Sequence, residues 1–255
     1  MLGRLRFRTI HFVVVGLLCP LLGYGVSVHA ATVLIAGGDA SIDGNYNSGY
    51  PFNTSRFRGG SMRYQQVYAT GEFAALDGPQ YLTAIAFRAD DAFGSAFAAT
   101  TLDIRVDLST TPQGADNLSP AFADNIGPDR RTVFDGLLTL TSSATRLTPG
   151  ARLFDVLLTL TDPFLFDPAR GNLLLDIRSY GTTSTTQMDS VFTRADGLSR
   201  VMSRDAQATS GYADTSGLIT RFTFQPQPVP LPPAIWLLAA PLLVLAGFRR
   251  CGGRH

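Results

Sequence analysis

Short stretches of alternating apolar and polar residues dominate the middle of the chain. Apolar side chains recur at every second position in residues 102–108, 154–160 and 173–177. A period of two places one set of side chains against a core and the other set toward water, which is typical of β-strands. Further strands are expected at residues 32–36, 64–69, 83–87, 133–141, 190–194, 199–204 and 218–224.

Nothing between these strands indicates helices. Residues 31–225 show no apolar period of 3.6, and Gly and Pro interrupt them throughout. About ten short strands without crossover helices favour packed antiparallel sheets over a parallel sheet. We therefore predict one all-β domain at residues 31–225, an antiparallel β-sandwich that is jelly-roll-like. Its 195 residues suffice for one substantial core, so disulfides are not required.

The N-terminus has the layout of a secretory signal peptide. Three Arg precede residue 9, an uncharged apolar run fills residues 12–28, and small or compact residues end at Ala30. This order predicts a signal peptide at residues 1–30 that is cleaved after Ala30. Two alternatives are a permanent membrane helix, which Pro and Gly in the second half of the run disfavour, and a lipoprotein signal lipidated at Cys19.

The C-terminus forms a second targeting device. Residues 226–233 are a proline-rich spacer, residues 234–248 carry no charge and include Trp236, and residues 249–255 form a basic tail. We predict a C-terminal transmembrane helix at 234–248, whose flanking Arg249 and Arg250 stay in the cytoplasm by the positive-inside rule. The alternative, a helix buried in the domain, conflicts with the prolines before it and with its lack of a polar face.

Composition excludes several functions. Residues 31–229 contain 15 Arg and 20 acidic residues, a net charge of −5, which gives no electrostatic footprint for nucleic acid. The chain has no Lys, and every His and Cys lies outside residues 31–225. The domain therefore has no side chains for a Ser-His-Asp triad, a Cys-His pair, a His/Cys zinc site or a Schiff base.

Three chemistries pass this filter. Two Asp could serve a glycosidase, although the adjacent Asp90 and Asp91 are interpreted as turn residues. Asp39, Asp43 and Asn45 could offer oxygen ligands to calcium, or could simply form Asx turns. One early group of aromatic residues could form a sugar-binding face, or could instead pack a long loop onto the domain through its own rings. That group is Tyr46, Tyr50, Phe52, Phe57, Tyr64 and Tyr68.

The C-terminal device resembles a known family of sorting signals. Val229, Pro230, Leu231 and Pro232, followed by an apolar helix and Arg249-Arg250, resemble the PEP-CTERM signal in its Val-Pro-Leu-Pro variant. The resemblance covers about the last 27 residues, and it departs from the pattern at Pro233 and Pro241. It implies that a membrane-embedded transpeptidase, exosortase, removes the helix in a Gram-negative host that makes exopolysaccharide. Residues 63–68, 85–88 and 166–173 also resemble uncharacterised domains of such precursors, which implies no activity.

These observations predict an exported, non-enzymatic protein. We expect an inner-membrane-anchored precursor that an exosortase-like enzyme sorts to the cell surface or extracellular matrix. The alternatives are a carbohydrate-binding module for matrix polysaccharide and an Asp-dependent glycosidase. No cofactor is expected, and calcium is the one metal for which the sequence offers ligands.

Overall fold

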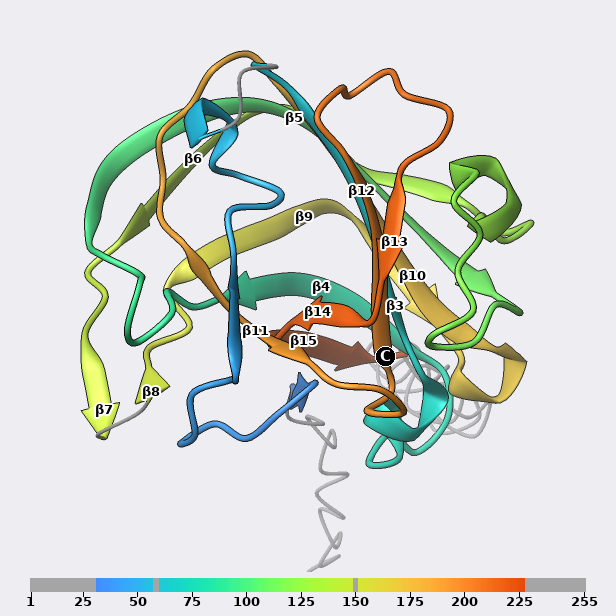
Figure 1. The fold of residues 1–255 in the computed structure, drawn as a ribbon. Coiled ribbons are helices and arrows are strands. Elements are labelled where there is room, and N and C mark those ends of the chain that lie inside the picture. The colour runs from blue at the N-terminus through green and yellow to red at the C-terminus, as the bar shows by residue number, and fades with distance from the viewer. Residues whose placement is uncertain (1–30, 57–59, 149–150, 228–255) are drawn as a thin grey trace, which may run out of the picture.

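The computed structural model describes residues 31–56, 60–148 and 151–227, which form one β-rich domain (Figure 1). Ala30, the sorting motif, Trp236, Arg249 and Arg250 lie outside these residues. In the part described, no helix is long and apolar enough to cross a membrane. The only helical elements in these ranges are the 3-10 turns η1 (Thr54–Arg56), η2 (Thr70–Phe73), η3 (Phe122–Asn125) and η4 (Pro168–Arg170).

Two large antiparallel sheets make up most of the domain. The four-stranded sheet has the order β1 (Thr32–Ala36), β15 (Thr220–Pro226), β4 (Gln80–Phe87) and β9 (Val156–Phe166). The six-stranded sheet has the order β13 (Tyr212–Asp214), β12 (Leu198–Ser203), β3 (Met62–Tyr68), β10 (Asn172–Tyr180), β5 (Phe97–Thr111) and β6 (Arg131–Ser142). All of their paired strands are antiparallel, which confirms the predicted all-β antiparallel class.

Both large sheets contribute to one apolar core. The alternating residues of β5, Leu102 to Leu108, and of β9, Val156 to Leu160, point into it as the sequence predicts. Its centre is aromatic: the rings of Phe73 and Phe166 lie 4.8 Å apart, and those of Tyr68 and Phe222 lie 4.9 Å apart. Every described residue of this core lies between positions 36 and 224.

The outer face of the six-stranded sheet is buried at its centre, where the alternating pattern predicts contact with water. Asp107 and Asp176 are buried. The segment that includes η3 covers this face, with Phe122 in a second apolar cluster beside Val67 and Leu174. The Asp176 carboxylate forms an ion pair there with Arg63 at 2.7 Å. The strands therefore alternate as predicted, but the polar side chains at the centre of the sheet are covered by protein and not by water.

A smaller sheet joins the two large ones at the side of the domain. It has the order β14 (Ser216–Leu218), β11 (Met188–Phe192) and β2 (Tyr46–Ser48). An isolated antiparallel bridge between Ala89, just after β4, and Met188, the first residue of β11, links the small sheet to the four-stranded one. The strands β7 (Arg146–Thr148) and β8 (Ala151–Arg152) form a separate two-stranded hairpin. β2 lies between the strands expected at residues 32–36 and 64–69, so the structure adds it to the predicted set.

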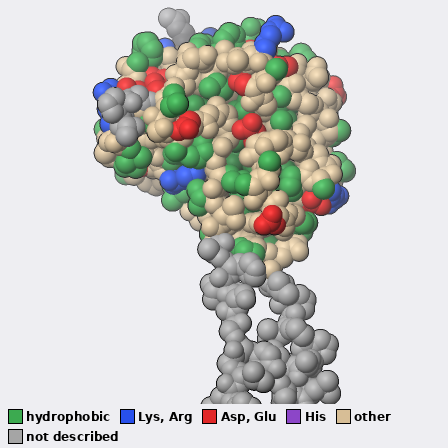
Figure 2. Space-filling view, turned by 90° about the horizontal axis from the view of Figure 1, so that it is seen from below, with side chains coloured by type: hydrophobic (Ala, Val, Ile, Leu, Met, Phe, Trp, Pro, Cys, Tyr) green, Lys and Arg blue, Asp and Glu red, His purple; other side chains and the backbone are tan. Residues whose placement is uncertain are grey.

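The two ends of the domain lie together. β1 pairs antiparallel with β15, and Thr32 is opposite Phe224 (Figure 1). The chain therefore enters and leaves the domain at the same pole. On the face in Figure 2, acidic side chains are scattered among apolar ones, and Arg side chains lie mostly toward its margin.

Candidate functional site

Three exposed aromatic residues define a surface that we call the aromatic strip: Tyr46 on β2, Phe192 at the end of β11 and Tyr212 on β13. Their side chains are 43%, 51% and 68% exposed. Tyr46 lies opposite Ser190 in the β2–β11 ladder, so Phe192, two residues farther along, projects from the same face. The Tyr46 and Phe192 rings accordingly meet, with centroids 5.3 Å apart.

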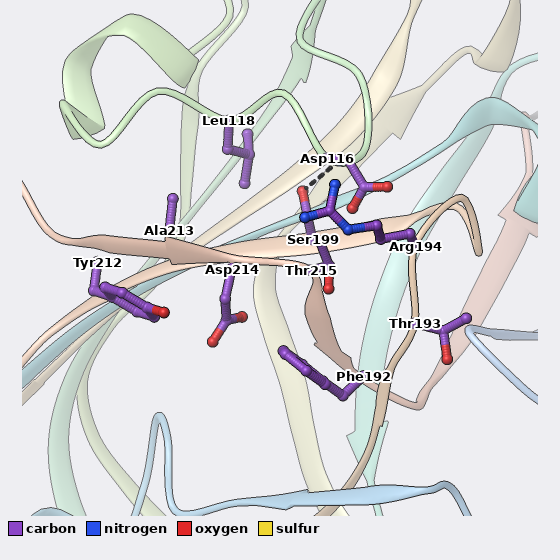
Figure 3. A pocket seen from close by; sticks show the side chains of 10 residues that line it. All are labelled: Asp116, Leu118, Phe192, Thr193, Arg194, Ser199, Tyr212, Ala213, Asp214 and Thr215. Atoms are coloured by element: carbon purple, nitrogen blue, oxygen red, sulfur yellow. Dashed lines mark hydrogen bonds between the residues drawn. The ribbon is translucent and has the colours of Figure 1, made fainter.

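Two depressions adjoin the aromatic strip, and Tyr212 borders both of them. The first has a volume of about 500 Å³ and includes Asp116, Phe192, Arg194 and Asp214 in its wall (Figure 3). The second has a volume of about 470 Å³. Its wall includes Tyr46, Tyr50, Arg56, Arg200, Arg204 and Tyr212. Both volumes lie in the range of small-molecule sites, and both walls combine rings with polar groups.

A buried ion pair separates the two depressions. Arg200 donates from Nε and Nη2 to the two carboxylate oxygens of Asp214, at 2.8 and 3.0 Å, and from Nη1 to Ser48 Oγ at 2.9 Å. Its guanidinium lies 5.9 Å from the centre of the Tyr46 ring. Three hydrogen bonds fix this guanidinium, so Arg200 on β12 links β2 to β13. It thereby holds in place the two strands that carry Tyr46 and Tyr212.

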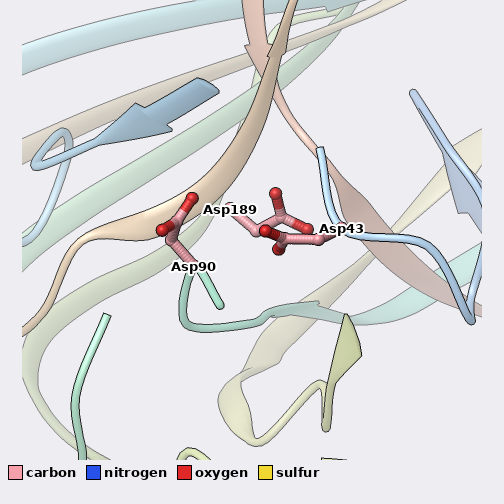
Figure 4. Close-up of side chains that lie close together, drawn as sticks. All are labelled: Asp43, Asp90 and Asp189. Carbon is pink, nitrogen blue, oxygen red and sulfur yellow. The ribbon is translucent and has the colours of Figure 1, made fainter. Parts of the chain in front are cut away.

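A second constellation is an acidic cluster formed by Asp43, Asp90 and Asp189 (Figure 4). One carboxylate oxygen from each lies within 4.8 Å of the others. Asp189 comes from β11, Asp90 from the turn after β4, and Asp43 from the loop before β2. Asp90 also caps its own turn, because its Oδ1 accepts from the backbone N–H groups of Ala92 and Phe93 at 3.0 and 2.6 Å.

Arg88 supplies the counter-charge of this acidic cluster. Its side chain is fully buried, its Nε donates to Asp189 Oδ2 at 2.7 Å, and its other nitrogens donate to the carbonyl oxygens of Ala40 and Ile42. The backbone N–H of Gly44 donates to Asp189 Oδ1 at 2.8 Å. A Cβ at Gly44 would lie only 2.1 Å from the Ser190 carbonyl oxygen, so this close approach requires glycine.

Three carboxyl groups beside one guanidinium cannot all ionise readily. Burial raises the pKa of Asp189 to about 7, against the opposing charge of Arg88. Burial also raises the pKa of Asp43 and of Asp90. Because carboxylate oxygens of the three groups lie within 4.8 Å of one another, the negative charge of Asp43 also raises the pKa of Asp189. The cluster therefore retains a proton at pH values where surface carboxyl groups have lost theirs.

Within the described residues, the oxygens of Asp43, Asp90 and Asp189 form a set that could hold a cation such as calcium. The expected calcium loop is only partly reproduced. Asp43 belongs to this set, but Asp39 is exposed and accepts from Ser41 in an Asx turn, at 2.7 Å from the Ser41 backbone nitrogen. The Asn45 side chain bonds Thr193 and the Phe192 backbone instead. Arg88 neutralises part of the negative charge of this set through its ion pair with Asp189.

The acidic cluster leads to a prediction about pH. A group with a raised pKa in the folded state stabilises the fold below its unfolded pKa, near 4, and loses that contribution as pH rises through its folded pKa, near 7. Asp189→Asn removes such a group. The difference in free energy of unfolding between wild type and variant, from urea unfolding in EDTA, is expected to shrink between pH 4 and pH 7. A difference that grows over this range would contradict the raised pKa.

The structure separates the predicted early aromatic group. Tyr50, Phe52, Tyr64 and Tyr68 are buried in the core, so packing is the role of most of the group. Tyr46 alone among its described members is well exposed, while Phe57 lies outside the described residues. The interpretation of Asp90 and Asp91 as turn residues is confirmed, because Asp90 caps the turn and Asp91 is the first residue within it. The Asp91 carboxylate ion-pairs with Arg146 at 2.5 Å, while its backbone N–H donates to Asp43 Oδ1 at 3.1 Å.

Sequence reasoning missed Asp189, Phe192 and Tyr212 as site residues. Each comes from a short strand far from Tyr46 or Asp43 in the sequence, and none belongs to a motif. The large apolar side chain of Phe192 inside the predicted 190–194 strand was the one signal that could have drawn attention to it. Comparison with known proteins adds no relative: no family model and no curated protein matches the chain.

Proposed function

We propose that this chain is an exported, C-terminally sorted protein of the cell surface or extracellular matrix, with a non-enzymatic domain that associates with exopolysaccharide. The observation that carries the proposal is the order of segments in the sequence. A signal-like start, a self-contained domain, a Val-Pro-Leu-Pro spacer, an apolar stretch and Arg249-Arg250 succeed one another. Its partners are an exosortase-like enzyme and polysaccharide. Fractionation of the producing cells tests it: the domain is expected outside the inner membrane, and a form confined to the cytoplasm would overturn the proposal.

The fold is consistent with such a role. Consecutive strands pass between sheets: β3 lies in the six-stranded sheet, β4 in the four-stranded sheet, and β5 in the six-stranded sheet again. The same exchange recurs from β6 to β9 and from β9 to β10. We infer from these crossings a jelly-roll-like sandwich, an architecture that lectin domains share. Because one fold hosts many functions, the fold itself does not decide the role, which depends on the surface.

Direct carbohydrate binding is a second candidate function, and the aromatic strip favours it. Exposed rings offer flat apolar faces, while the adjoining depressions supply hydrogen-bonding groups. The core of the domain holds the strands that carry these rings, so little ordering entropy is lost on binding. A sugar ring, which has one apolar face and polar edges, matches this combination.

Removal of single rings tests the strip. Tyr46→Ala and Tyr212→Ala are each expected to weaken retention of the 31–227 domain on immobilised matrix polysaccharide about tenfold, as for aromatic residues that dominate interfaces. Phe93→Ala is the matched control, because Phe93 is an exposed ring (70%) outside both depressions. Equal losses in all three variants would contradict a binding role for the strip.

The structure offers one pair of carboxylates for the glycosidase alternative. Asp116 and Asp214 line the first depression, and no other carboxylate stands in its described wall. Both hold structural partners, because Asp214 binds Arg200 and Asp116 Oδ2 accepts from the Ala195 backbone at 2.8 Å. Reducing sugar released by the wild type but not by Asp116→Asn would establish hydrolysis in place of binding.

A further inference from the structure

The second depression is positively charged although the domain is acidic. Arg56, Arg200 and Arg204 line it, and its described wall contains no Asp or Glu. Residues 31–229 as a whole have a net charge of −5. A basic depression on an acidic protein focuses attraction for an anion at one place while the rest of the surface repels it.

The three guanidinium groups have different roles. Arg200 is buried and fixed by Asp214 and Ser48, so its charge is largely neutralised. Arg56, at the end of η1, and Arg204, just after β12, are exposed at the rim. An incoming anion therefore meets Arg56 and Arg204 rather than Arg200.

Arg204 is oriented by the core. Its guanidinium hydrogen-bonds the hydroxyl of Tyr50, whose ring is buried and stacks on Tyr64 with centroids 6.4 Å apart. Burial raises the pKa of Tyr50, so the hydroxyl remains neutral and available as an acceptor. A guanidinium presents its N–H donors in a planar fork that matches a carboxylate, and the contact with Tyr50 orients this fork.

We propose that the second depression binds a carboxylated sugar unit of an acidic polysaccharide. Arg56 and Arg204 pair with the carboxylate, while the exposed rings of Tyr46 and Tyr212 contact the sugar face. The proposal rests on the carbohydrate-binding function above and specifies its ligand class. Nucleic acid, which is also anionic and stacks on rings, fits less well, because its densely charged backbone would meet the acidic remainder of the domain.

The test compares one polymer in two charge states. Residues 31–227 are titrated calorimetrically with a polygalacturonate oligosaccharide, with its carboxyl-reduced neutral counterpart, and with a single-stranded DNA oligonucleotide. Binding of the acidic sugar alone, weakening as salt is raised, is the expected result. Equal binding of both sugars would overturn the acidic preference but leave carbohydrate binding intact. Binding of neither sugar would overturn both, and preferential binding of DNA would overturn the ligand class.

Charge-matched variants locate the site. The double variant Arg56→Gln and Arg204→Gln is expected to bind the acidic sugar at least about tenfold more weakly, because charge-assisted bonds are lost. Arg130→Gln with Arg131→Gln removes the same net charge from exposed positions outside the depression and is expected to bind as the wild type does. Similar weakening in both double variants would show a general charge effect and overturn the assignment of the site. Thermal unfolding curves of all variants verify that each is folded.

Discussion

The extracellular form of this protein is expected to contain no tryptophan. Trp236 is the only tryptophan in the chain, and it follows Pro232 by four residues within the predicted transmembrane helix. If an exosortase-like enzyme cuts at or near residues 229–233, every indole leaves with the helix. The matrix form should then fluoresce as tyrosine alone, and mass spectrometry should find no peptide that contains Trp236 or Cys251.

Loss of processing should reverse this result. A triple variant, Leu231→Ala, Pro232→Ser and Pro233→Ala, removes the motif but spares most of the apolar stretch. It is expected to remain in the inner membrane with Trp236, as is the wild-type chain in a host without the sorting enzyme. Pro228→Ala changes a spacer proline outside the motif and serves as the control. An extracellular form that retains Trp236 would defeat the sorting proposal and favour a permanent tail anchor.

Replacement of Asp189 by Ala is expected to cause the largest loss of stability among single changes at the acidic cluster. Arg88 would keep its charge in a fully buried position without its carboxylate partner, and the Gly44 N–H would lose its acceptor. Breaking a buried pair in this way costs about 3–5 kcal/mol. Urea unfolding at pH 8, where Asp189 is largely ionised, measures the change through the transition midpoint.

A surface pair of the same residue types provides the control. Arg131 and Asp162 lie 3.2 Å apart with side chains more than half exposed. Asp162→Ala is expected to change the free energy of unfolding by less than about 1 kcal/mol, because solvent screens this pair. If both variants lost a similar amount of unfolding free energy, the Arg88–Asp189 pair would contribute little to stability. The acidic cluster would then not organise the loop before β2.

The long strands could be predicted because their signal is local. In β5 and β9, one strongly apolar face repeats every second residue, and the strand boundaries differ from prediction mainly by extension. β2, β13 and β14 have only three residues each, too few to show a period. β2 and β14 form by pairing with β11, and β13 forms by pairing with the preceding strand β12, so the three residues of each strand do not specify it on their own.

The candidate sites were harder to foresee than the fold. Asp43 and Asp189 are 146 positions apart, and no local pattern reports that their carboxyl groups meet. Arg88 would be expected at the surface from its residue type, yet it is fully buried because Asp189 and two carbonyl oxygens satisfy its donors. Tyr46 could be identified as a binding candidate, but only the fold shows that Phe192 and Tyr212 accompany it.

The position of β15 also determines how the domain would bear mechanical load. β15 pairs with β1 on one side and β4 on the other, and its last residues lead directly into the spacer. If the C-terminal end is tethered to the cell and bound polysaccharide is dragged by flow, tension enters along the axis of β15. Because antiparallel hydrogen bonds run perpendicular to the strands, such a pull shears both ladders together instead of peeling them bond by bond. β1 is then loaded only through its hydrogen bonds to β15, so extraction of β15 has to break both ladders.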